Sequence, residues 1–230
     1  MNRTAQLNSQ AIDRVCHGDC IGAVRTLGSA LSDITAKVTS RPPSPPEQDE
    51  ETTTNSEQRP RSSTFRVNTS FHYLGVQTLK SSIAYFERPF EIKSFPSNGD
   101  EITDEQAAYL SSVVFYNMGL AMFVDYKKDT KDYERLLQAH DCFLRTYDVL
   151  SVCKLESDDS KLILMLATCN NLAAIHGDLG NIPMLHFWGD KFQVVLDFCD
   201  PSSHWEDANY HTFRMKKLLN AFSFSAASAA

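Results

Sequence analysis

Residues 107–124 form a run of eighteen residues without a charged side chain. A run of this length reaches the lower limit for a helix that crosses a lipid bilayer. The run also contains Ser111, Ser112, Asn117 and Gly119, and a helix that is apolar all round equally suits the centre of a stack of helices. No Trp flanks the run, although membrane-spanning helices often carry one at the interface. We therefore predict a buried core helix and no membrane association.

The other apolar residues recur at spacings of three and four, which is typical of amphipathic helices. The stripes predict helices that include residues 7–15, 24–38, 136–150 and 162–179. Gly18-Asp19 separates the first two by a short turn, so these two helices must pack antiparallel.

Local capping signals set the other helix ends. Thr103 and Gln106 match a capping box at the start of the uncharged helix, which we expect to end near residue 126. Pro183 suits the first turn of a further helix that runs to about residue 199. Ser203 caps a last helix through residue 222, which we expect to cover the end of the stack.

Two segments interrupt the helical pattern. Residues 40–64 contain five Pro, nine Ser or Thr, and no aliphatic or aromatic residue, so we predict a disordered linker. Residues 65–95 are rich in aromatic residues in short alternating runs, which predicts an extended insertion or a β-hairpin turning near residues 78–82. A helix through residues 76–86 is the alternative. The predicted organisation is an N-terminal helix pair (1–39), a disordered linker (40–64), an extended insertion (65–100), a helical body (101–222) and a frayed tail (223–230).

Composition limits the class of protein. The chain has 22 Lys and Arg against 29 Asp and Glu, a net charge of −7, which argues against a nucleic-acid partner held by a basic surface. The N-terminus has no signal-peptide pattern, and the six cysteines form no Cys-x-x-Cys pair. We predict a cytoplasmic protein with reduced thiols, and a nuclear location stays open.

The sequence offers little evidence for a catalytic or metal-binding motif. Phosphate-binding glycine loops, the zinc motif His-Glu-x-x-His and the hydrolase motif Gly-x-Ser-x-Gly do not occur in the sequence. Cys16, His17 and Cys20 lie close together, but zinc needs four ligands and no second pair is in view. His140 and Cys142 would point from diverging faces of a helix. We predict no catalytic residues, no metal site and no cofactor.

A short sequence motif recurs within the predicted helices. Asn117-Met118-Gly119 and Asn171-Leu172-Ala173 share an Asn two positions before a small residue. The N-terminal pair offers small residues and a turn at regular spacing, namely Ala11, Gly18, Ala23 and Ala30. In each unit the small residue would lie where a neighbouring helix approaches closely.

These features resemble the tetratricopeptide repeat, a helix-turn-helix unit of about 34 residues. The interrupted repeats, the aromatic insertion and the Ala-rich end are similar to TPR-like proteins expanded in diatoms. Gly119 and Ala139 are twenty residues apart, about eight more than in the standard repeat, and Leu185 stands where a small residue belongs. The resemblance implies an all-α fold of antiparallel helix pairs stacked as an α-α superhelix, with a short extended or β-hairpin insertion around residues 65–95.

The resemblance also implies a function. Stacked helix pairs form a curved groove suited to a peptide or helix of another protein, so we expect a non-enzymatic interaction module with a protein partner. The candidate binding residues are Asn117 and Asn171 with their neighbours Tyr116 and Asn170. The two repeated asparagines have two possible roles: they bridge to a neighbouring helix or loop backbone, or they face the groove and bind a peptide backbone. A small helical enzyme or cofactor-binding domain is the alternative function, and self-association through apolar faces stays open.

Overall fold

The computed structural model describes residues 3–40, 66–69, 85–94, 102–153, 159–198 and 213. In this described part the chain forms six helices and two short strands, namely α1 (Arg3–Cys16), α2 (Cys20–Thr39), β1 (Arg66–Thr69), β2 (Phe90–Ser94), α3 (Asp104–Lys128), α4 (Tyr133–Val152), α5 (Asp159–Asp178) and α6 (Ile182–Phe198). The fold is therefore mostly helical, as the periodicity predicts.

Local signals account for the helix ends. The Thr103 hydroxyl accepts a hydrogen bond from the Gln106 N–H at 3.1 Å, and the Gln106 side chain accepts one from the Thr103 N–H at 2.8 Å, which confirms the capping box. Gly18 and Gly180 adopt φ of +84° and +66°, a conformation that glycine tolerates best, and so end α1 and α5. The uncharged helix continues to Lys128, two residues past the expected end.

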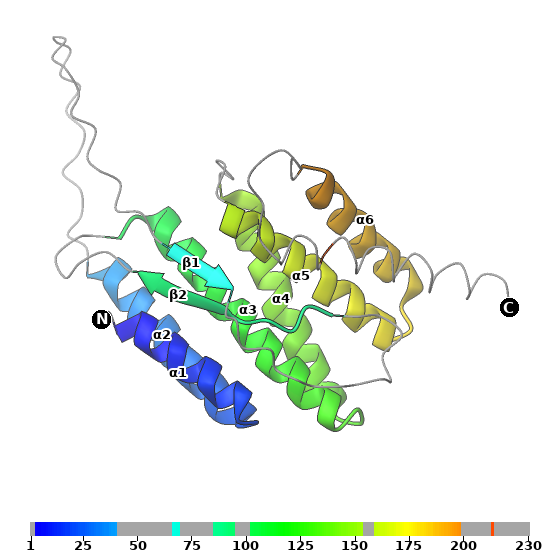
Figure 1. Ribbon diagram of the computed structural model, residues 1–230, viewed down its shortest axis with the longest axis horizontal. Coiled ribbons are helices and arrows are strands. Elements are labelled where there is room, and N and C mark those ends of the chain that lie inside the picture. Colours follow the sequence, from blue (N-terminus) through cyan, green and yellow to red (C-terminus); the bar gives the residue numbers. More distant parts are fainter. Residues whose placement is uncertain are drawn as a thin grey trace, which may run out of the picture.

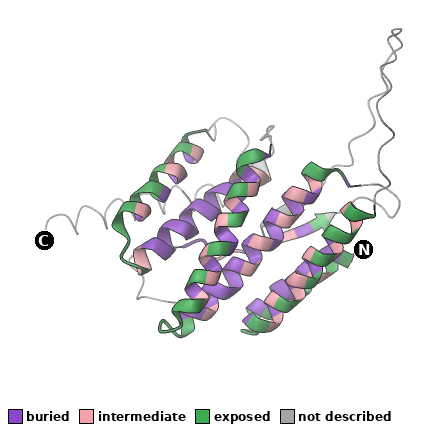
Figure 2. Cartoon of the chain, turned by 180° about the vertical axis from the view of Figure 1, so that it is seen from behind, coloured by how far each residue is buried: buried purple, intermediate pink, exposed green. Residues whose placement is uncertain are grey.

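Consecutive helices pack against each other along the chain. The contacts join α1 with α2, α3 with α4, and α5 with α6, and further contacts join α2 with α3 and α4 with α5 (Figure 1). Buried residues line most of α3 (Figure 2). This helix is long and apolar enough to cross a membrane, but 78% of its most apolar window is buried inside the protein. That burial favours the predicted core helix.

A close approach of α3 and α4 explains the small residue at Gly119. A Cβ atom at this position would lie 3.1 Å from ring carbons of Phe143 and 3.2 Å from the carbonyl oxygen of Ala139. Glycine therefore lets the two helices approach more closely than a side chain would permit.

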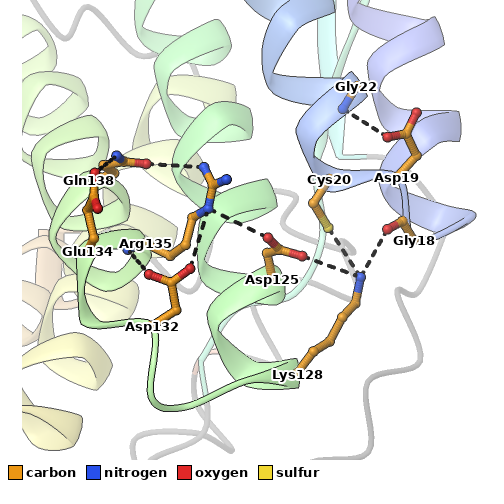
Figure 3. A network of polar contacts seen from close by, with 10 residues as sticks. All are labelled: Gly18, Asp19, Cys20, Gly22, Asp125, Lys128, Asp132, Glu134, Arg135 and Gln138. Carbon is orange, nitrogen blue, oxygen red and sulfur yellow. Dashed lines mark hydrogen bonds and ion pairs between the residues drawn. The ribbon is translucent and has the colours of Figure 1, made fainter.

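A polar network joins the α1–α2 turn to the body (Figure 3). The Lys128 ammonium donates to the carbonyl of Gly18 at 3.0 Å and lies 3.8 Å from the Asp125 carboxylate. Asp125 in turn lies 3.7 Å from the Arg135 guanidinium at the start of α4. The last turn of α3 thus links the N-terminal helix pair to α4.

The described part of the insertion consists of two short strands and of residues 85–89, which are neither helix nor strand. β1 pairs antiparallel with β2, with Thr69 opposite Phe90 and Val67 opposite Ile92. Residues 85–89 are not helical, so the part of the alternative helix at residues 85–86 was wrong. Other expectations lie outside the described residues: the linker beyond Ser40, the hairpin turn at 78–82, the last helix except Phe213, and the tail.

Candidate functional site

The chain's own extended segment, Tyr85–Ser94, lies against the helices. It runs from near α5 across α3 to β2, which packs beside α1 (Figure 1). Its apolar side chains at Tyr85, Phe86, Phe90 and Ile92 are each at most 3% exposed. An extended backbone buried among helices cannot use the helix backbones as partners, because these are already bonded within each helix. Where β1 does not pair with it, its N–H and C=O groups therefore need side chains.

Asn117 supplies those partners for Phe90. Its side-chain oxygen accepts from the Phe90 N–H at 2.9 Å, and its amide donates to the Phe90 carbonyl at 2.8 Å. Asn8 of α1 donates to the same carbonyl at 3.0 Å and accepts a second bond from Asn117 at 2.8 Å. Asn8 and Asn117 are both at most 3% exposed. Two helices thus hold one residue of the segment by its backbone.

Asn171 repeats the arrangement four residues earlier in the segment, at Phe86. Its side-chain oxygen accepts from the Phe86 N–H at 2.6 Å, and its amide donates to the Phe86 carbonyl at 3.1 Å. The Tyr116 hydroxyl donates to that carbonyl at 3.2 Å and accepts from Asn171 at 3.2 Å. Burial raises the pKa of Tyr116 well above its usual range, so this hydroxyl keeps its proton and remains a donor. We call Asn8, Tyr116, Asn117 and Asn171 the asparagine clamp.

Three of the four predicted binding residues meet at this clamp, and the fourth lies behind it. Asn170 is 3% exposed and donates to the Asn171 side-chain oxygen at 3.5 Å. It supports Asn171, and no bond from it to the segment is seen among the described residues. The sequence analysis missed Asn8, because it lies three positions before the small residue Ala11 instead of two. An Asn one turn before a small residue in an amphipathic helix was the available signal.

Aromatic rings fix the side chains of the segment. The Phe90 ring meets Tyr116 edge-on with centroids 5.0 Å apart, and the Phe86 ring stacks on Phe213 at 4.7 Å. Phe213 in turn lies 5.9 Å from Phe192 of α6. Such contacts add to the burial energy of the rings. The clamp thus binds the backbone while neighbouring rings receive the side chains.

A largely buried ion pair lies at the α5 end of the site, with side-chain exposures of 5% for Lys127 and 13% for Asp178. Lys127 of α3 is 9% exposed and forms an ion pair with Asp178 of α5. Its ammonium lies 5.8 Å from the Tyr85 ring centre and 5.0 Å from that of Phe123, within the range of cation–π attraction. Lys127, one residue past the expected end of this helix, is therefore buried in the last turn of α3.

The described cysteines differ in their surroundings. Burial raises the pKa of the Cys142 thiol to about 11 and that of Cys169 to about 12, so neither offers a thiolate near neutral pH. Cys16 is exposed, whereas Cys20 is buried with its sulfur 3.5 Å from the Lys128 ammonium. Among the residues that the structure describes, no group of three or more His, Cys, Asp or Glu is placed to hold a metal.

Comparison of the chain with protein-family models, with curated proteins and with solved structures gave no match. Membership of the tetratricopeptide-repeat family therefore stays a prediction from the sequence.

Proposed function

We propose that this chain is a non-enzymatic interaction module whose helix pairs stack as a TPR-like superhelix and bind an extended segment of a partner protein. Two features support the superhelix. Consecutive helices pack in chain order, and the small residue of the repeated motif lies at a close approach of α3 and α4. In such a stack α1, α3 and α5 are the first helices of their pairs and together line one groove.

The observation that carries this proposal is the asparagine clamp. Asn117 and Asn171 each bond both the N–H and the C=O of a single residue in an extended chain. Every non-proline residue presents these two groups, so the clamp can hold a segment from another protein as it holds Tyr85–Ser94. Of the two roles left open by the sequence, the described contacts are those of the bridge to a loop backbone. The peptide-binding role is part of this proposal, because a partner's backbone presents the same two groups.

Function requires that a partner segment replace the chain's own segment, Tyr85–Ser94, at the clamp. A partner segment with similar side chains makes the same contacts, so little contact energy is lost when it replaces Tyr85–Ser94. The chain's own segment has the advantage of being tethered, which corresponds to an effective concentration on the order of millimolar. We therefore expect the wild-type chain to bind a free segment weakly, and a chain with a weakened segment of its own to bind it more tightly.

The test uses a fluorescent peptide with the sequence of residues 84–95. Its anisotropy is measured during titration with the wild-type chain and with Phe90→Ala. Loss of a buried Phe ring costs about 3–5 kcal/mol, and in this variant only the internal competitor loses it. The variant should bind the peptide at least about tenfold more tightly than the wild type.

Leu150→Ala is the matched control. Leu150 is fully buried on α4, a helix that packs mainly on α3 and α5, so this variant is destabilised without a change in the segment. It should bind the peptide as the wild type does. If the peptide binds neither the wild type nor Phe90→Ala, the segment is a permanent part of the core and the proposed function is wrong.

A further inference from the structure

We propose that the partner segment carries two phenylalanines four positions apart, and that this pair selects the partner of the asparagine clamp. The inference rests on the proposed function and specifies the ligand of the same site. The clamp alone cannot choose among partners, because it contacts backbone groups that nearly all residues share. Selection must come from the side chains that the site receives.

The positions of Asn117 and Asn171 set the spacing. They lie on different helices, α3 and α5, and hold residues 90 and 86 of the segment. The ring centroids of Phe86 and Phe90 are only 6.2 Å apart, whereas four residues of a fully extended strand span about 13 Å. The segment is therefore not fully extended between the two asparagines, and residues 85–89 form no strand. A segment with its rings three or five residues apart cannot present one ring-bearing residue to each asparagine.

The surroundings of the two rings select for aromatic side chains. Phe86 and Phe90 are each 1% exposed, and each contacts a further aromatic ring, Phe213 or Tyr116. Burial alone would accept Leu or Ile, but edge-on and stacked contacts with rings favour another ring. A Phe replaced by Ala would leave a cavity at either position.

Among the other positions of the segment, Tyr85, Pro89 and Ile92 are buried, whereas Glu91 and Lys93 are partly exposed. Pro89 is buried and has no N–H, so this position of the segment needs no backbone donor. Glu91 and Lys93 form an ion pair with each other, and their side chains are 24% and 49% exposed. The Lys93 side chain is therefore on the surface and does not contribute to selection. The ligand class is an extended segment with the pattern Phe-x-x-x-Phe, in which Pro is accepted before the second Phe.

Competition binding tests the pattern. Unlabelled peptides of residues 84–95 displace the fluorescent wild-type peptide from the Phe90→Ala chain. The set comprises the wild-type peptide, its Phe86→Ala and Phe90→Ala forms, a form with one Gly inserted after Glu87, and Lys93→Ala as the control. We expect both Phe→Ala peptides and the Gly-inserted peptide to compete at least about tenfold less well than the wild type, and Lys93→Ala to compete equally.

The outcomes separate the two proposals. If the altered peptides compete as well as the wild type, the Phe-x-x-x-Phe pattern is wrong and the peptide-binding function stands. If the labelled wild-type peptide does not bind at all, the proposed function itself fails. A Phe90→Leu chain, which retains most of the side-chain volume, replaces Phe90→Ala as receptor if the latter does not fold, and the same outcomes apply.

Discussion

Asn171 holds the N–H and the C=O of Phe86, a residue 85 positions earlier in the chain, at 2.6 and 3.1 Å. The side-chain amide presents the same donor and acceptor that a neighbouring β-strand would present. An extended segment can therefore lie against helices without a strand on that side. The repeated Asn in otherwise apolar helices is explained by this requirement, since buried backbone groups must be paired.

Asn117→Ala and Asn171→Ala should each destabilise the protein. Each change leaves one buried backbone N–H of the segment without its acceptor, whereas the carbonyls keep a bond from Asn8 or Tyr116. An unpaired buried group costs about 1–3 kcal/mol, which should appear as a lower free energy of unfolding in urea. Ser29→Ala on the exposed side of α2 is the control and should change little. Equal stability of the Asn variants and the wild type would show that the clamp contributes nothing.

The contact at Gly119 predicts opposite effects at two glycines. Gly119→Val places a side chain 3.1–3.2 Å from Phe143 and Ala139, and overpacking of this kind costs about 1–3 kcal/mol. A Cβ at Gly28 of α2 meets nothing within 4 Å, so Gly28→Ala should raise stability by up to about 1 kcal/mol through helix propensity. Thermal unfolding of both variants measures the difference. If Gly119→Val were as stable as the wild type, α3 and α4 would have to be packed less closely than the structure shows.

The Lys127–Asp178 ion pair predicts a non-additive effect. Lys127→Met leaves the Asp178 carboxylate beside an apolar group, and removal of one partner from a buried pair costs about 3–5 kcal/mol. The double variant Lys127→Met with Asp178→Leu should recover most of this loss, because no charge is then left buried. A double-mutant cycle from urea unfolding gives the coupling energy. If the stability losses of the two single variants simply added in the double variant, the two side chains would not interact.

His176 predicts a dependence of stability on pH. Its side chain is buried on α5, and burial together with the nearby His140 ring, 5.0 Å away, lowers the pKa of His176 below its usual value. Below about pH 6.5 the unfolded chain binds a proton at this residue that the folded chain does not yet bind. Stability should therefore fall as the pH drops through 6.5, and level off below the folded pKa.

The measurement for His176 is urea unfolding at about pH 7.5 and about pH 5.5, compared with His176→Leu. The variant should lose less stability between these two pH values than the wild type, because the titrating group is gone. Other residues also titrate in this range, so only the difference between the two proteins carries the prediction. An identical pH dependence in both would contradict it.

The sequence by itself determined the helices of the described part and, to within a few residues, their ends. Helix periodicity, the Thr103–Gln106 capping box and the glycine turns depend on residues a few positions apart, so they can be seen in a linear chain. The same holds for the repeated Asn before a small residue, which predicted a shared role for Asn117 and Asn171. What these asparagines bind was not predictable, because the extended segment lies 27 and 85 residues away in the chain. The burial of Lys127 and the role of Asn8 likewise arise only when helices far apart in sequence pack around that segment. Local sequence patterns reflect the conformation of each element. The partners of a buried polar group depend instead on which elements pack together, and only the tertiary structure decided which elements do so.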